Sequence, residues 1–297
     1  MRIALLGTGP WAQAAHAPAL AGHPGLDFTG VWGRRPDAAA ELAARYGVRA
    51  YDDVDALLAD VDAVAMAVPP SVQAELAVRA ARAGRHLLLD KPLAAGVAEG
   101  RAVVEAVERA QVASVVFFTT RFQKEPEAWI EEQAAVAGWF TARAQWLGAV
   151  FTSDSPFAHS PWRREKGALW DVGPHALSLL LPVLGDVRAV AAATHGPADT
   201  VHLVLDHATG ASSTLTLSLT APPAAAGADL ELRGEAGTAV LPRSSEGAVP
   251  ALTRAADALL TAARTGRPHP CDATFGLRIT EILSTAEARL AGHTVAD

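Results

Sequence analysis

The sequence predicts an α/β protein of two domains: a doubly wound parallel sheet, then an α+β domain with an open, mostly antiparallel sheet. Its 297 residues exceed one ordinary domain. Up to about residue 118, short apolar runs alternate with alanine-rich helical patterns, as in successive βαβ units. Beyond about residue 139, longer runs alternate polar and apolar residues, which is typical of antiparallel strands that bury one face.

The elements follow from these patterns. In the first domain we expect strands at 2–7, 28–33, 62–68, 86–90 and 113–118. Helices are expected between them at 12–22, 36–47, 53–61, 70–84 and 96–110. In the second domain we expect strands at 139–151, 188–195, 200–207, 211–220, 228–235 and 237–242. Helices at 174–184, 250–266 and 272–290 should cover one face of that sheet or return to the first domain, and 221–228 should be a surface loop.

Composition excludes several classes of protein. Half of the residues are hydrophobic, 19% are charged and the formal net charge is −7, so the chain suits a globular fold and offers no basic surface for nucleic acid. The single cysteine, Cys271, rules out an internal disulfide or a cysteine-based zinc site. His202 and His207 should point to opposite faces of one strand, so we expect no metal site. No membrane span or export signal is expected, and the protein should be cytoplasmic.

A glycine-rich turn follows the first expected strand. It reads "GTGPWA", with Gly7 for the tight turn, Gly9 for close approach of the backbone to a pyrophosphate, and Ala12 for helix packing on the strand. A plain turn between strand and helix is the alternative. The strand before it and the helix after it favour a dinucleotide site.

The end of the second strand bears on which dinucleotide is bound. An NAD site usually has Asp or Glu there, but this corner reads "VWGRRPD" and presents Gly33, Arg34 and Arg35. Two guanidinium groups suit the 2′-phosphate of NADP, although they could equally be solvated surface charges. We therefore expect NADP to be preferred over NAD.

Two further segments carry candidate catalytic groups. "HLLLDKP" ends a buried strand with Asp90, Lys91 and Pro92, and the proline holds the lysine backbone extended, so that Lys91 could give or share a proton. "GALWDVGPHALSLLL" places Asp171 and His175 at a helix start. There the helix dipole disfavours the protonated form of the imidazole and a nearby carboxylate favours it, as suits an acid–base histidine. A charged strand end and an interior histidine are the structural alternatives.

Together these motifs resemble the oxidoreductases named Gfo/Idh/MocA, after glucose-fructose oxidoreductase, inositol dehydrogenase and a rhizopine-catabolism enzyme. The resemblance covers essentially the whole chain. Its motifs are the glycine turn leading into "HAPAL", the "VPPS" turn, Asp90-Lys91-Pro92, "RF" at 121–122, "WR" at 162–163, and Gly-x-x-x-Asp-x-Gly-x-His at 167–175.

The resemblance implies a Rossmann NAD(P)-binding domain at 1–119 and an α+β substrate-binding and oligomerisation domain at 120–297. It implies that Lys91, Asp171 and His175 are catalytic, and that the Lys91–Pro92 bond is cis. The expected cofactor-binding residues are Gly7, Thr8, Gly9, Pro10, Trp11, Ala12, Gly33, Arg34, Arg35, Val68, Pro69, Pro70, Asp90, Lys91, Pro92 and Arg121. The expected substrate-binding residues are Lys91, Trp162, Arg163, Asp171 and His175.

Departures from the family pattern leave the substrate open. Asp90 replaces the usual glutamate, Gln73 stands where a histidine is common, and the glycine run before Asp171 is reduced to Gly167. Trp170, like Trp162 and Arg163, could line a sugar-sized pocket or serve as packing.

The resulting expectation is reversible hydride transfer between nicotinamide C4 and a carbinol or carbonyl carbon of a sugar, polyol or cyclitol-like molecule. Two alternatives stay open: a glycoside-cleaving or eliminating enzyme that recycles bound NAD, and a non-catalytic NAD(P)-sensing regulator. Relatives cover the open face of the second sheet with another subunit, so we expect a homodimer or homotetramer through it.

Overall fold

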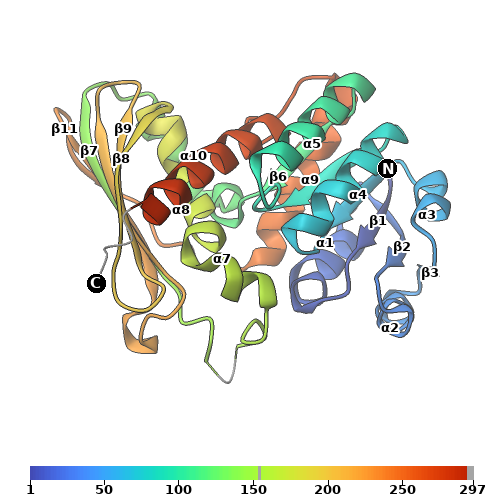
Figure 1. Cartoon of the computed structure of the whole chain (residues 1–297). Coiled ribbons are helices and arrows are strands. Elements are labelled where there is room, and N and C mark those ends of the chain that lie inside the picture. Colours follow the sequence, from blue (N-terminus) through green and yellow to red (C-terminus); the bar gives the residue numbers. More distant parts are fainter. Residues whose placement is uncertain (153–154, 293–297) are drawn as a thin grey trace. The chain divides into compact units, whose positions relative to one another are not determined.

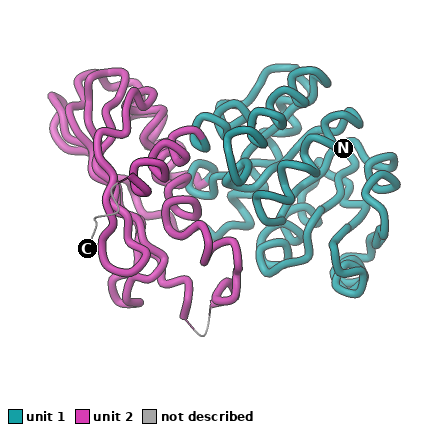
Figure 2. The backbone as a smooth tube through the Cα atoms, in the orientation of Figure 1, with its two compact units in different colours: residues 1–122, 246–280 teal, residues 123–245, 281–297 magenta. Residues whose placement is uncertain are grey.

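The computed structural model describes residues 1–152 and 155–292, and the chain divides into two compact units (Figure 2). The first unit comprises Met1–Phe122 and Glu246–Thr280, and the second comprises Gln123–Ser245 and Glu281–Asp297. This division differs from the expected one at residue 119 because 246–280 group with the first unit. Helix α9 (Ala248–Thr265) packs on strands β5 and β6 there, and the Cys271 carbonyl accepts a hydrogen bond from Val116 N at 2.7 Å.

The first unit is built on a six-stranded parallel sheet in the order β3-β2-β1-β4-β5-β6, which confirms the predicted doubly wound fold. Its strands are β1 (Arg2–Leu6), β2 (Asp27–Trp32), β3 (Arg49–Tyr51), β4 (Ala63–Met66), β5 (His86–Asp90) and β6 (Ser114–Phe117). Four of the five predicted strands, β1, β4, β5 and β6, are apolar runs because both faces of the sheet are covered, so almost every side chain on them is buried.

Helices cover the sheet of the first unit (Figure 1). They are α1 (Ala17–Gly22), α2 (Pro36–Tyr46), α3 (Val54–Asp60), α4 (Pro70–Arg82), α5 (Val97–Ala110) and α9, with a 3₁₀ turn η2 (Thr119–Phe122). Helices α4 and α5 pack against each other, and α1 packs against α9. Helix α10 (Ala273–Gly292) begins in this unit and continues in the second.

Two features of the first unit differ from the sequence expectation. Strand β3 was not expected, because it is a three-residue edge strand without an apolar run, in which only Tyr51 is buried. It pairs with Gly30–Trp32 of β2. The helix expected at 12–22 is interrupted, since Ala12–His16 form a π-helical turn, η1, before α1 begins. The wider turn places His16 fully inside the protein.

The second unit contains a six-stranded sheet in the order β12-β11-β7-β10-β9-β8. Its strands are β7 (Trp139–Leu147), β8 (Val187–His195), β9 (Val201–His207), β10 (Ser212–Ser218), β11 (Gly227–Gly234) and β12 (Gly237–Val240). Only the β7–β10 pair is parallel, so the expected mostly antiparallel sheet is confirmed. The expected surface loop at 221–228 is largely exposed and holds a short 3₁₀ turn, η3 (Pro223–Ala225).

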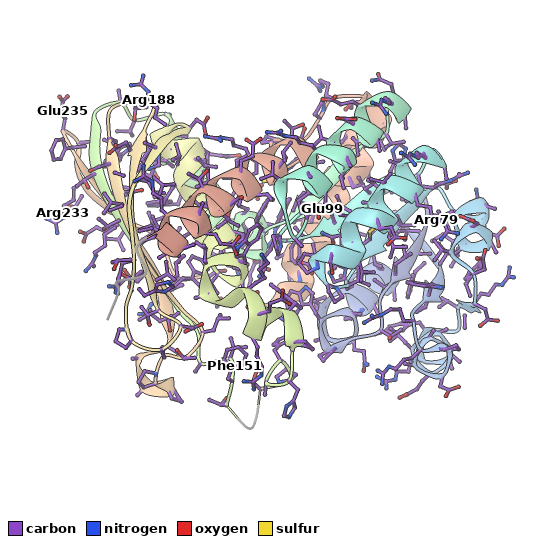
Figure 3. All side chains as sticks on the ribbon, viewed as in Figure 1. Arg79, Glu99, Phe151, Arg188, Arg233 and Glu235 are labelled. Carbon is purple, nitrogen blue, oxygen red and sulfur yellow. The ribbon has the colours of Figure 1, made fainter. Side chains whose placement is uncertain are left out.

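The two faces of the second sheet differ in chemistry. Ala144 of β7 pairs with Leu215 and Leu230, and all three are buried. Helix α7 (Pro161–Asp171) packs on β10 and helix α8 (Gly173–Leu184) on β7, while helix α6 (Lys124–Ala134) packs against α8. On the opposite face Arg143 pairs with Thr214 and Glu231, and this face is polar. Figure 3 shows Arg188, Arg233 and Glu235 projecting outward from the rim of this sheet.

Helices α7 and α8 form a nearly continuous helical stretch at residues 161–184. Helix α7 was not expected; Gly167, at φ 63° and ψ −163°, breaks its regular geometry. Helix α8 begins at Gly173, one residue before the predicted start. The stretch is long and apolar enough to cross a membrane by composition, but 83% of its most apolar window is buried inside the structure, as in the core helix of a globular protein.

Candidate functional site

The turn after β1 requires glycine at its first position. Gly7 has φ 131°, a backbone conformation that L side chains rarely adopt, and its N–H donates to the Trp32 carbonyl at 2.8 Å. A Cβ at this position would lie 2.3 Å from the Ala67 carbonyl oxygen. The turn therefore passes directly against the end of β4, which sets the shape of the space beyond the two strands.

Beyond this turn lies a hollow of about 390 Å³. It is lined by Gly7, Thr8, Gly9, Trp32, Gly33, Arg34, Arg35, Ala67, Val68 and Pro69. A Cβ on Gly9 would meet no atom within 4 Å, so the backbone at Gly9 borders open space, as expected for close approach of a pyrophosphate. Eight of the predicted cofactor-binding residues thus border one hollow at the carboxyl ends of β1, β2 and β4.

The other small residues of the turn serve packing. A Cβ on Gly33 would lie 2.7 Å from Thr8 Cγ2, so Gly33 makes room for the threonine side chain. The Thr8 carbonyl accepts a hydrogen bond from Gln13 Nε2 at 3.0 Å, and Ala12 is completely buried. These contacts fix the glycine turn against η1 and leave its open side toward the hollow.

Arg34 and Arg35 form the cationic side of the hollow. Both are exposed, and Arg35 is the N-cap residue of α2, so the helix N-terminus and two guanidinium groups share one corner. Neither guanidinium group makes an ion pair with a residue that the structure describes. The donor set fits a dinucleotide, with backbone N–H groups and a helix start for phosphate and two cations for further negative charge.

The turn after β5 carries the predicted lysine. The Lys91–Pro92 peptide bond is cis, as the resemblance implied. The Asp90 side chain, 9% exposed as a residue, accepts a hydrogen bond from Lys91 N at 2.8 Å, and its other oxygen lies 3.3 Å from His16 Nε2. Gln73 makes four hydrogen bonds to the backbone of this turn. The carboxylate at this position therefore belongs to the support of Lys91.

Sequence reasoning did not assign a role to His16 or Gln73. His16 lies in "HAPAL" and contacts the rings of Trp11 and Phe117 edge to face. Gln73 was noted only as a departure from the family pattern. A polar residue among small apolar residues on a helix face was the available signal, but its partner on another element cannot be read from the sequence.

Remaining predicted cofactor residues occupy neighbouring elements of the same unit. Pro10 opens the helical segment after the glycine turn, and Pro70 is the first residue of α4. Arg121 lies in η2. Burial, and to a lesser extent the charge of Arg121, lower the pKa of His269 to about 4. The His269 ring stacks on Phe122 at a centroid distance of 5.4 Å.

In the second unit, Asp171 is paired with a predicted substrate residue. Arg163 Nε donates to Asp171 Oδ2 at 2.8 Å, and the Asp171 residue is only 4% exposed. The guanidinium carbon of Arg163 lies 4.4 Å from the Phe157 ring centroid and 4.7 Å from that of Trp162. Asp171 therefore holds a guanidinium group that also lies over two aromatic rings.

Trp170 belongs to the core. It is 2% exposed, and its Nε1–H donates to Glu287 at 2.9 Å. Of the two roles left open for this tryptophan, the structure supports packing.

His175 occupies the first turn of α8, as predicted. Its ring stacks on Trp146 of β7 at a centroid distance of 5.3 Å and an interplanar angle of 9°. Gly173 lies close to α10, since a Cβ there would lie 2.9 Å from Leu283 Cδ2, a terminal methyl group. Lys91 lies in the first unit and Asp171 and His175 in the second, so the convergence of these three groups stays a prediction.

Metal ligation finds no support in residues 1–152 and 155–292. No group of three or more His, Cys, Asp or Glu side chains in these ranges is arranged to hold a metal ion. The site chemistry that the structure describes is that of backbone amides, guanidinium groups, one lysine and one histidine.

Known proteins that are similar to this chain include two dehydrogenases. 4-Carboxy-2-hydroxymuconate-6-semialdehyde dehydrogenase of Sphingobium sp. is 29% identical over 229 residues, which cover 73% of this chain and 72% of that protein. Levoglucosan dehydrogenase of Pseudarthrobacter phenanthrenivorans is 29% identical over 165 residues, or 52% of this chain and 42% of that protein. The second alignment therefore spans less than half of the relative.

Solved structures share the fold. GenD2 from gentamicin A biosynthesis, in complex with NAD, matches with a TM-score of 0.85 and 22% identity over 98% of this chain and 94% of that chain.

The model of an oxidoreductase family with an NAD-binding Rossmann fold matches residues 1–118, and that of the Gfo/Idh/MocA C-terminal domain matches residues 101–240. The chain therefore belongs to the Gfo/Idh/MocA family of NAD-binding oxidoreductases.

Proposed function

We propose that this chain is an NADP-preferring dehydrogenase or reductase that transfers hydride between the nicotinamide and a carbinol or carbonyl carbon of a sugar, polyol or cyclitol-like molecule. The observation that carries the proposal is the hollow beside Gly9, Arg34 and Arg35 at the carboxyl ends of β1 and β4. Lys91 follows β5, the next strand of the same sheet. The levoglucosan dehydrogenase relative supports the choice of a sugar-like substrate.

The cofactor would be held by the residues of the hollow. The backbone at Gly7, Thr8 and Gly9 would bind the pyrophosphate, and Arg34 and Arg35 would bind the 2′-phosphate at the start of α2. When bound, the nicotinamide supplies the group that accepts or donates hydride.

The protein groups would control the proton. We assign Lys91 to polarising the substrate oxygen and sharing its proton, and His175 to the principal acid–base role. The stacking on Trp146 fixes the plane of the His175 ring, which favours a defined direction of proton transfer. Asp171 holds Arg163, and together they would anchor a neighbouring hydroxyl of the substrate.

The cofactor preference is testable with the double variant Arg34→Ala/Arg35→Ala. Loss of charge-assisted contacts from two guanidinium groups to the 2′-phosphate should weaken NADPH binding by at least about 100-fold, because each such hydrogen bond contributes about 1.5–3 kcal/mol. Binding of NADH, which lacks this phosphate, should change by less than about threefold. The Kd values come from nucleotide fluorescence titrations. The control is Arg82→Ala, which removes an exposed charge at the C-terminal end of α4 and should leave both Kd values unchanged. An equal loss of NADPH and NADH binding in the double variant would contradict the NADP preference.

The catalytic assignment is testable with Lys91→Ala. Turnover should fall by at least about 100-fold, a loss typical for removal of a positioned acid–base group, while NADPH binding stays near the parental value. The change in NADPH is followed at about 340 nm, as consumption of NADPH with carbonyl substrates and as formation of NADPH from NADP+ with sugars and polyols, and Lys124→Ala is the matched control. Product formation without net NADPH change would instead indicate an internally recycled cofactor.

We further propose a cytoplasmic homodimer or homotetramer that assembles through the open face of the second sheet. A shallow concavity of about 310 Å³ on this face is lined by Thr141, Ala142, Arg143, Thr214, Glu231 and Arg233. Mixed charges among short threonine side chains suit a self-complementary interface. Light scattering of the parent and of Thr214→Arg tests the proposal, because a buried arginine in the middle of the face should halve the mass, to a monomer from a dimer or to a dimer from a tetramer. A monomeric parent would contradict it.

A further inference from the structure

We propose that Gln73 is a positioning residue that fixes the turn carrying Lys91 and thereby aims the lysine. The inference rests on the proposed function, because it assigns a support for the group to which we give the catalytic role. Gln73 does not line the hollow. Its side chain hydrogen-bonds to the backbone on both sides of Lys91.

The hydrogen bonds of Gln73 surround the lysine. Its Oε1 accepts from Asp90 N at 2.8 Å, and its Nε2 donates to the Asp90 carbonyl at 2.7 Å. The same Nε2 lies 3.1 Å from the carbonyl oxygens of Pro92 and Leu93. The side chain is buried, with 1% of the residue exposed. One amide group therefore ties together the residue before Lys91 and the two residues after it.

The position of Gln73 explains why the turn needs this support. Strand β5 pairs with β6 as far as Asp90, but its pairing with β4 ends at Leu88. From there β4 leads into α4, whose first turn carries Gln73. The glutamine amide takes the place that the next residue of β4 would have filled, since it both accepts from and donates to the Asp90 backbone, as a paired strand does.

The turn also leaves carbonyl groups that need a donor inside the protein. Pro92 contributes no N–H, and Leu93 is buried. Nε2 is the only donor of the glutamine side chain, and its two hydrogens serve three carbonyl oxygens. A buried carbonyl without a donor is unfavourable, so removal of Nε2 should let the turn around Lys91 rearrange.

Chemistry distinguishes glutamine from its possible replacements at this position. Glutamate has the same shape but no donor, and it would set a carboxylate against three carbonyl oxygens. Histidine, the residue common in the family, has only two ring nitrogens and cannot reproduce the set of one acceptor and three donor contacts. Leucine keeps the bulk and removes every hydrogen bond. We therefore expect kcat to fall by an increasing amount along the series Gln73→Asn, Gln73→His, Gln73→Leu and Gln73→Glu.

Activity provides the first test. In Gln73→Leu, kcat should fall by about 10- to 100-fold, the range of losses from a misplaced catalytic group, while the Kd for NADPH stays within about threefold of the parental value. The buried Gln133→Leu in α6 removes another interior glutamine and should leave kcat unchanged. Gln73→Asn keeps the amide and should recover part of the loss, and it serves as the test if the leucine variant does not fold.

The lysine itself can be observed without turnover. The sequence has three lysines, Lys91, Lys124 and Lys166, so Lys124→Arg/Lys166→Arg leaves a single ¹³C-dimethyl-lysine resonance after reductive methylation. In the parent background this resonance should be single and displaced from the value of a free lysine. With Gln73→Leu it should move toward that value or split.

The two readouts separate the inference from the proposed function. An altered Lys91 resonance together with reduced kcat and unchanged NADPH binding supports the inference. An unchanged resonance in Gln73→Leu would overturn it, whether or not the parent turns over any substrate. If the parent shows no turnover on the substrate screen, the proposed function fails, and the resonance alone still decides whether Gln73 positions the lysine.

Discussion

Replacement of Gly7 by alanine should destabilise the first unit strongly. The backbone at Gly7 has φ 131°, which costs about 1–3 kcal/mol for a residue with a side chain. The new Cβ would lie 2.3 Å from the Ala67 carbonyl oxygen, and both atoms sit on backbone that cannot rotate away. Forced displacement in a packed region costs a further ~1–3 kcal/mol, giving about 2–6 kcal/mol in all.

Gly9→Ala is the matched change two residues along the same turn. A Cβ there meets no atom within 4 Å, so the free energy of unfolding should change by less than about 1 kcal/mol. The methyl group would instead extend into the space that the pyrophosphate needs, and the Kd for NADPH should rise by about tenfold or more. One glycine of the motif thus serves the fold, and the other serves binding.

Urea unfolding followed by circular dichroism measures the first effect, and NADPH fluorescence titration of the folded variants measures the second. The reasoning is refuted if Gly7→Ala unfolds at the parental urea concentration, because the close approach to β4 would then be absent. It is equally refuted if Gly9→Ala binds NADPH with the parental Kd. A loss of stability in both variants would show that the two positions are not distinct.

Two further predictions concern buried charge. Arg163→Met should lower the free energy of unfolding by about 2–4 kcal/mol, because it removes the guanidinium partner of the buried Asp171 carboxylate. Arg164→Met, at an exposed position, should lower it by less than about 1 kcal/mol. Equal losses of stability in urea unfolding would contradict this. His269 has a folded-state pKa of about 4, lowered from 6.5 by burial and by Arg121, so the unfolded state binds more protons between these values and stability falls as the pH drops through about 6.5 toward 4. At about pH 5 this amounts to roughly 1–2 kcal/mol, and His269→Gln should lose less stability than the parent between about pH 7.5 and pH 5; identical pH dependence would refute the assignment.

The parts of the fold that could be predicted are those whose sequence pattern reflects burial. Strands β1 and β5 are covered on both faces, so they are short apolar runs that any window of sequence reveals. Strand β3 is formed by pairing with β2 at an exposed edge, and its three residues carry no such pattern. The π-helical turn at Ala12–His16 has ordinary helical composition, so the difference from an α-helix comes from what the turn packs against.

The residues of the candidate site likewise fall into those that could be predicted from the sequence and those that could not. Gly7 and Lys91 could be found because each depends on neighbours in sequence: a strand end, a tight turn or a following proline. The pairing of Asp171 with Arg163 joins α7 residues eight positions apart across the Gly167 break, and α7 itself was not anticipated. Gln73 and His16 act on Asp90 from 17 and 74 residues away. Contacts of this kind are set by the assembled sheet and leave no periodic trace in the sequence.

The turn after β5 shows how the fold and the site depend on each other. A lysine at a strand end is free to take many orientations, and an extended backbone alone limits only its starting direction. Here the backbone of Asp90, the residue before the lysine, donates one hydrogen bond to the buried Gln73 amide and accepts another from it. The Asp90 carboxylate contacts Lys91 N and the buried His16. Because both supporting residues come from helical segments that follow β1 and β4, the strands flanking the hollow, the same short segments shape the proposed cofactor site and aim the proposed catalytic lysine. A substitution in either support should therefore alter turnover before it alters nucleotide binding, since the hollow itself is lined by neither His16 nor Gln73.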